Sequence, residues 1–117
     1  MNERMLRVNS TIREVLADAV ERMNDSRLEM VSITAVDTAP DLRHAKVYFD
    51  VLGSDDHEPA LAALQGASKR LQGAIASQVR MKYTPTLEFE IDPAITSGER
   101  IEAILRSIKE AGGGEDE

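Results

Sequence analysis

The middle of the chain holds the residues whose types and spacing best suit contact with a ligand. In residues 59–87 every charged side chain is a cation, and there are four of them: Lys69, Arg70, Arg80 and Lys82. Arg80 and Lys82 stand two residues apart, directly before Tyr83. Cationic side chains bind phosphate oxygens, and a tyrosine ring can stack on a nucleobase. This segment predicts RNA binding; the alternative for Arg80 and Lys82 is two solvated charges that complement a helix C-terminus.

The overall charge points the other way. Fourteen Lys and Arg stand against 21 Asp and Glu, a net charge of -7, and such a balance disfavours nucleic acid. The charges are distributed unevenly, however. Residues 28–58 hold seven acids and two bases, and residues 88–117 hold nine acids and three bases. A polarised molecule can present one basic face while the rest of its surface is acidic.

Further cations lie outside this segment. Arg43 and Lys46 either contact phosphates or neutralise the nearby Asp41 and Asp50. The first predicted helix opens with two more arginines, which either contact RNA or fix local geometry. The complete predicted RNA-binding set is Lys69, Arg70, Arg80, Lys82, Tyr83, Arg43, Lys46, Arg4 and Arg7.

No arrangement of residues predicts catalysis. The sequence contains no GxxxxGK[ST] or GxGxxG loop and no His-x-x-x-His pair, and His44 and His57 are 13 residues apart. The run Asp55–Glu58 is better explained as a solvated helix N-terminus than as a metal site, because four consecutive residues cannot converge on one ion. We therefore expect no enzyme activity, no catalytic residue, no metal and no cofactor.

Length and composition predict one small domain. The 117 residues include no cysteine, which excludes disulfides and thiolate metal sites and fits a reducing compartment. No secretory signal is visible, and no apolar run approaches the roughly 20 residues that span a membrane. We expect a cytoplasmic protein with no membrane contact, formed by a single domain over residues 1–110 and a disordered acidic tail over residues 111–117.

Hydrophobic periodicity predicts the secondary structure. Apolar residues recur at helical spacing in three stretches: 4–23, 58–81 and a final helix that Ser97 caps. Alternation predicts three strands, in which these residues face the core: Val31, Ile33 and Ala35; Ala45, Val47, Phe49 and Val51; Leu87, Phe89 and Ile91. The first two strands form an antiparallel hairpin around a turn at 38–41. Ser54, Asp55 or Asp56 caps the second helix.

This order predicts an α+β domain of two layers, a three-stranded sheet with helices on one face. The second helix is long for so small a domain. Its middle consists of the small residues Gly66, Ala67 and Ser68, where we expect a bend. The other face of the sheet carries Tyr48 and several charges, and is either solvated or a docking surface.

Five motifs, taken in order and spacing, resemble one known family. They are RVNSTI (7–12), SITAV (32–36), PDLRHAKVYF (40–49), RMKYTPTLEF (80–89) and SGERI (97–101). Together they are similar to ribosome-binding factor A over nearly the whole chain, up to about residue 108. The motifs at 40–49 and 80–89 are the specific ones, because a chance match to both with the right elements between them is improbable.

The resemblance implies a type II KH-like fold of order α-β-β-α-α(kinked)-β plus a C-terminal helix. It implies a non-catalytic, cold-shock-associated assembly factor that binds the 30S subunit and precursor 16S rRNA during late maturation and rRNA processing. Such a protein prefers immature subunits, acts as a monomer, needs no small-molecule substrate and is bacterial or organellar. The family has an Ala-x-Gly helix kink, where this chain has Ala67-Ser68-Lys69 preceded by Gly66.

A second hypothesis comes from another functional class. The chain would be a protein-interaction module whose acidic surfaces dock basic ribosomal proteins, with only incidental RNA contact. The net charge favours this interpretation, and the acid-free segment 59–87 opposes it. Salt titration on naked RNA separates the two, because phosphate binding weakens steeply with salt.

Overall fold

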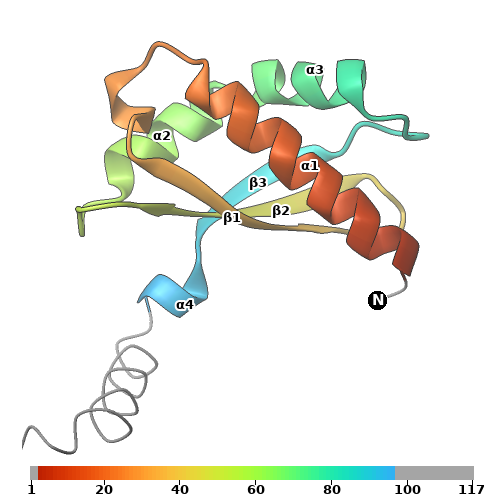
Figure 1. Cartoon of the computed structure of the whole chain (residues 1–117), viewed down its shortest axis with the longest axis horizontal. Coiled ribbons are helices and arrows are strands. Elements are labelled where there is room, and N and C mark those ends of the chain that lie inside the picture. The colour runs from red at the N-terminus through yellow and green to blue at the C-terminus, as the bar shows by residue number, and fades with distance from the viewer. Residues whose placement is uncertain (1–2, 97–117) are drawn as a thin grey trace, which may run out of the picture.

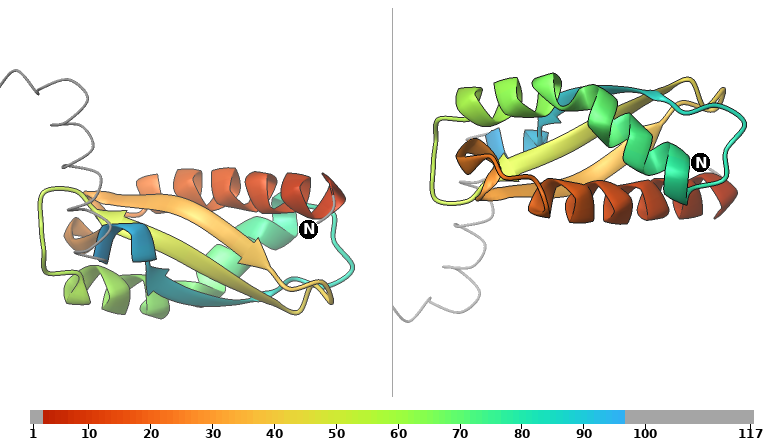
Figure 2. Two further views of the ribbon diagram at one scale, coloured as in Figure 1. Left: turned by 90° about the horizontal axis from the view of Figure 1, so that it is seen from below. Right: turned by 90° about the horizontal axis from the view of Figure 1, so that it is seen from above.

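A computed structural model describes residues 3–96, which form a sheet covered on one face by helices (Figure 1). The elements, in chain order, are α1 (Glu3–Glu21), the short 3-10 helix η1 (Ser26–Leu28), β1 (Val31–Thr38), β2 (His44–Val51), α2 (Glu58–Gly66), α3 (Ser68–Gln78), β3 (Thr86–Ile91) and α4 (Pro93–Thr96). Helices α1, α2 and α3 lie on the same side of the sheet, and of the helices in residues 3–96 only the short α4 lies on the opposite side, near one end (Figures 1 and 2).

The sheet has the strand order β1-β2-β3 and is mixed. Strands β1 and β2 pair antiparallel, as the predicted hairpin requires, and β3 pairs parallel to β2. A parallel neighbour needs a crossover connection, which α2 and α3 provide. The α+β class and the α-β-β-α-α-β order are therefore confirmed. The predicted final helix from Ser97 and the predicted domain boundary after residue 110 lie outside the described residues.

The core lies between the sheet and the three helices. Its fully buried side chains come from every layer: Ile12, Leu16, Val47, Phe49, Leu64, Leu71 and Ile75. Each such side chain stabilises the fold by about 1.5–3 kcal/mol through burial. The predicted inward positions of β2 and β3 are confirmed, since Phe49 is fully buried and Leu87 and Phe89 are at most 8% exposed.

Strand β1 departs from the predicted alternation. We expected Ala35 to face the core after Val31 and Ile33, but Ala35 is exposed and Val36 and Thr38 are buried. The reason is a β-bulge between Ile33 and Ala35, which leaves one residue of β1 without a partner on β2. From Ala35 onward the alternation is therefore shifted by one residue, so that Ala35 points away from the core and Val36 points into it. The strand continues to Thr38, and the turn therefore begins later than predicted.

The bend in the long helix is confirmed and divides it into α2 and α3. It lies at Ala67 (φ -95°, ψ 6°), whose N–H contacts the carbonyls of Ala63 and Leu64 at 3.0 and 3.1 Å. No close packing requires a glycine at Gly66, because an added Cβ there would meet nothing within 4 Å. The helix is thus kinked with Lys69 at the position where the resemblance implied a glycine. The helix also ends earlier than predicted, since Val79 is already extended (φ -121°, ψ 128°).

Two of the three residues predicted to cap α2 accept backbone N–H groups at its start. The Asp56 carboxylate accepts the Glu58 N–H at 3.2 Å, and the Ser54 hydroxyl accepts the Asp56 N–H at 3.0 Å. The N-cap residue itself is His57, whose side chain makes no cap bond, so the predicted N-cap at Ser54, Asp55 or Asp56 is wrong. Within residues 3–96, no helix is both long and apolar enough to cross a membrane.

Candidate nucleic-acid interface

Three segments far apart in the sequence meet at one end of the molecule: the start of α1, the β1–β2 turn and the α3–β3 loop (Figures 1 and 2). Between them they carry most of the predicted RNA-binding residues. We call this surface the basic end, and it consists of Arg4, Arg7, Arg43, Arg80, Lys82 and Tyr83.

A shared hollow and a backbone hydrogen bond show that the three segments are neighbours. A hollow of about 340 Å³ between α1 and the end of α3 is lined by Arg4, Arg7 and Val79, the residue before Arg80. The β1–β2 turn meets the α3–β3 loop where the Thr86 N–H donates to the Arg43 carbonyl at 2.9 Å. The cations of the three segments, although distant in sequence, therefore lie at the same end of the molecule.

Two side-chain amides tie the segments of the basic end to the rest of the domain through hydrogen bonds. The Asn9 carboxamide oxygen accepts the buried Thr38 N–H at 2.9 Å, tying α1 to the edge strand β1. The Gln72 amide donates to the Pro85 carbonyl at 2.9 Å, which fixes the end of the α3–β3 loop to α3. Pro85 is itself fully buried. Sequence reasoning missed both anchors, although Asn9 lies three residues before Ile12 on the apolar stripe of α1 and so carried a signal.

Within the described part of the chain, most cations of the basic end form no ion pair, although the same segments also carry the exposed acids Glu3 and Asp41. The Arg43 guanidinium lies 4.3 Å from the Tyr83 ring centroid and the Lys82 ammonium 5.6 Å from it, both within cation–π range. Among residues 3–96 only Arg7 of this set has a carboxylate within 4.0 Å, the exposed Glu3 at 3.7 Å. These charges are available to an external anion.

Lys69 and Arg70 form a second cationic region at the helix kink. Arg70 lines a hollow of about 280 Å³ with Arg27, Gly66 and Ala67, and a second of about 200 Å³ with Arg22. Helix α3, about 16 Å long, separates this region from the basic end. These two predicted residues therefore lie on a different surface from the basic end.

The arginines beside Arg70 are already engaged by acids. Arg22 pairs with Asp18 at 3.3 Å and Arg27 with Asp25 at 2.7 Å. Side-chain and backbone hydrogen bonds from Arg27 lower the pKa of the Asp25 carboxyl. Neither arginine was predicted, because both stand among acids in the sequence.

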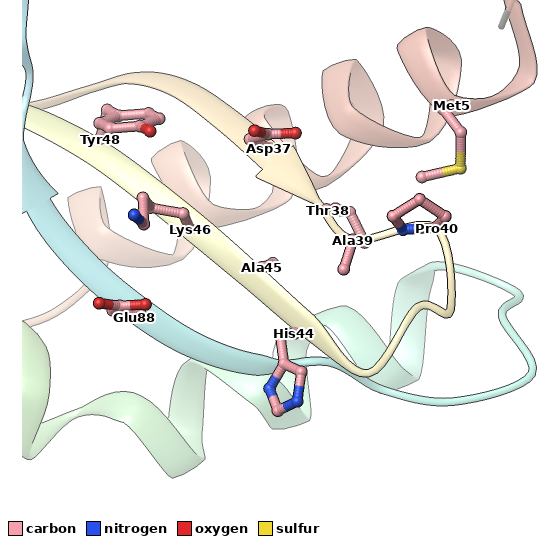
Figure 3. Close-up of a pocket in the computed structure, with 10 residues that line it drawn as sticks. All are labelled: Met5, Asp37, Thr38, Ala39, Pro40, His44, Ala45, Lys46, Tyr48 and Glu88. Atoms are coloured by element: carbon pink, nitrogen blue, oxygen red, sulfur yellow. The ribbon is translucent and has the colours of Figure 1, made fainter. Parts of the chain in front are cut away.

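The structure does not bring Lys46 together with the other cations. It lies on the open side of the sheet, beside Tyr48 and Glu88 (Figure 3), and its ammonium is 3.7 Å from the Glu90 carboxylate. We call this side the open face; its polar side chains include Asp37, His44, Lys46, Tyr48, Glu88 and Glu90. Most of them line an open hollow of about 580 Å³ that reaches Met5 and Pro40.

The two histidines form no site of their own. His44 borders the hollow of the open face (Figure 3), and the His57 ring lies 3.9 Å from the Asp50 carboxylate. In the part of the chain that the structure describes, no three His, Asp or Glu side chains are placed to hold a metal ion.

Comparison with known proteins assigns the family. The family model described as Ribosome-binding factor A matches residues 4–105. The chain belongs to the ribosome-binding factor A family. The factor from Carboxydothermus hydrogenoformans is 42% identical over 114 residues, covering 95% of this chain and 91% of the relative. That from Rubrobacter xylanophilus is 37% identical over 111 residues, covering 94% and 88%.

Solved structures of ribosome-binding factor A have the same KH-like fold. The crystal structure of the factor from Thermus thermophilus matches 74% of this chain and 94% of that chain, with a TM-score of 0.69 and 31% identity. A homology model of the Thermus thermophilus factor, fitted into a cryo-EM map of a 30S–factor complex, matches 73% of this chain and 91% of that chain, with a TM-score of 0.62 and 33% identity. The family resemblance and the KH-like fold inferred from the motifs are both confirmed.

Proposed function

We propose that this chain is a ribosome assembly factor that binds the 30S small subunit and precursor 16S rRNA through its basic end. It assists late 30S maturation and 16S rRNA processing in the cytoplasm, including during cold adaptation. The observation that carries the proposal is the meeting of five cations from three separate segments at one end of an otherwise acidic domain. The 30S complex of the Thermus thermophilus relative supports the choice of partner.

Binding energy alone is sufficient for this role. Cations that neutralise phosphates release condensed counterions from RNA, and this gives affinity without sequence-specific contacts. A protein that binds the immature subunit more tightly than the mature one shifts the population toward the immature form and leaves when maturation removes its site. A monomer without cofactor or small-molecule substrate meets these requirements.

The open face favours a second candidate function, docking to basic ribosomal proteins with incidental RNA contact. Its carboxylates at Asp37, Glu88 and Glu90 surround one lysine that is already paired. Phosphates would be repelled from this surface, and basic protein segments would be attracted to it. The two candidates use different surfaces of the domain, so variants on each surface separate them.

The test is co-sedimentation of the purified protein with immature and mature small subunits. We expect wild type to pellet with both, preferentially with immature ones, and Arg80→Ala/Lys82→Ala to stay in the supernatant. The matched control is Arg22→Gln/Lys46→Gln, which removes two cations that already have carboxylate partners. Failure of wild type to pellet contradicts the proposal, and equal pelleting of both double variants favours the protein-docking candidate.

A further inference from the structure

Tyr83 is one of four large hydrophobic side chains exposed within residues 3–96, and the only aromatic one among them. It is 37% exposed although its loop is firmly held on both sides. Val79 still donates its N–H to the Ile75 carbonyl at 2.8 Å, and Pro85 is buried beneath the Gln72 amide. An aromatic ring fixed at the surface loses little conformational freedom when a flat partner stacks on it.

The surroundings of Tyr83 favour a flat, negatively charged partner. Arg43 lies against the ring at 4.3 Å, and its own backbone is fixed by bonds to Asp41 and Thr86. Arg80 and Lys82 precede the ring in the same loop and have no carboxylate within 4.0 Å in the described chain. Lys82 has a flexible stem and can turn from the ring edge to a phosphate.

A nucleotide with an unpaired base fits this arrangement. Bases inside an A-form duplex are covered by their neighbours, whereas bases in loops, bulges and ends are free to stack on aromatic side chains. We propose that Tyr83, backed by the Arg43 guanidinium, stacks on an unpaired base of single-stranded RNA while Arg80 and Lys82 hold the adjoining phosphates. The inference rests on the proposed function and extends it by naming the state of the RNA that this surface selects.

The first test compares a short single-stranded RNA of mixed sequence with a duplex of the same length. Tyr83→Ala binds the single strand about tenfold more weakly than wild type, because one stacked base is lost. Tyr83→Phe keeps the ring and stays within about twofold of wild type. Duplex binding of Tyr83→Ala stays within about twofold of wild type, because phosphate contacts dominate it.

The second test uses tyrosine fluorescence, since the chain has two tyrosines and no tryptophan. In Tyr48→Phe the only fluorophore is Tyr83. Single-stranded RNA should lower its emission by more than the inner-filter effect of the RNA's own absorption. In Tyr83→Phe the only fluorophore is Tyr48 on the open face, and its emission should show the inner-filter loss alone.

The failures are distinguishable. If wild type binds both RNAs and Tyr83→Ala binds them equally well, or loses affinity equally for both, the stacking proposal is overturned and the proposed function stands. If wild type binds neither RNA, the RNA part of the proposed function fails together with the stacking site. Quenching of Tyr48 in place of Tyr83 would move RNA to the open face and overturn both.

Discussion

The basic end and the open face are opposite in charge although both present a tyrosine. The basic end gathers five cations from helix, turn and loop, and one of them has a carboxylate within 4.0 Å in the described chain. The open face gathers carboxylates at Asp37, Glu88 and Glu90, and its single lysine pairs with one of them. The net charge of -7 therefore agrees in sign with the open face and does not describe the basic end.

The difference follows from the elements that carry the charges. Strand alternation sends every second residue of β2 and β3 outward, so Glu88 and Glu90 must share the open face once Leu87 and Phe89 are buried. The basic end is built where strands and helices stop and the chain turns. The charge of the basic end depends on which loops come together in the fold. Composition alone does not predict that.

Reversing the charge of the basic end should have the largest effect. Arg80→Glu/Lys82→Glu replaces two cations by two acids, and we expect RNA affinity at low salt to fall by about a hundredfold or more. Filter binding or fluorescence anisotropy measures it, with thermal unfolding as a check that the exposed loop tolerates the change. A loss below about threefold would mean that RNA does not contact this end.

Removing the first anchor should reduce the stability of the fold. Asn9→Ala leaves the buried Thr38 N–H without its acceptor, and we expect the free energy of unfolding to fall by about 1–3 kcal/mol. Urea denaturation measures this change. The control is Ser10→Ala, an exposed neighbour on α1, which should stay within about 0.5 kcal/mol of wild type. Equal midpoints for the two variants would show that Asn9 does not anchor the helix.

Removing the second anchor should act on the basic end and spare the open face. Gln72→Ala frees the Pro85 carbonyl, and we expect a loss of about 0.5–1.5 kcal/mol in the free energy of unfolding. Amide exchange should accelerate in residues 79–84 and stay unchanged in β2. Gln78→Ala, an exposed glutamine of the same helix, is the control. Uniform acceleration across the sheet would contradict a local role.

Neutralising the open face should have the smallest effect on RNA. Asp37→Asn/Glu88→Gln removes two acids, and we expect RNA affinity to rise by less than about threefold at low salt and not at all at high salt, because salt screens charges at this distance. Titrations at two salt concentrations measure it. A fall in RNA affinity would place RNA on this face. A selective loss of binding to basic ribosomal proteins would favour the second candidate function.

Most of the fold could be predicted because its periodic signals are regular. Alternation in β2 and β3 and the helical stripes placed Val47, Phe49 and Leu71 correctly in the core. The exposure of Ala35 could not be predicted, since a bulge depends on pairing with β2 and leaves no mark in local alternation. The stop of α3 at Gln78 likewise depends on the loop that follows, which must reach Arg43.

The sequence indicated which residues to expect in the candidate site, but only partly where those residues lie in the fold. The acid-free segment identified Arg80, Lys82 and Tyr83 as neighbours, which local sequence guarantees. The contact of Arg43 with Tyr83 joins positions 40 residues apart and required the sheet register to be known. Lys46 and Arg43 look alike in sequence, yet one lies on the open face and the other at the basic end, because strand and turn direct them differently.

The salt dependence of RNA binding tests most directly whether the basic end holds the phosphates. For single-stranded RNA, Arg80→Ala/Lys82→Ala should reduce the slope of log affinity against log salt by about 1.4, the value for two lost phosphate contacts. The control Arg22→Gln/Lys46→Gln should keep the wild-type slope. Equal slopes for all three proteins, or a reduction in the control as large as in the basic-end variant, would contradict a phosphate-binding role for this end of the domain.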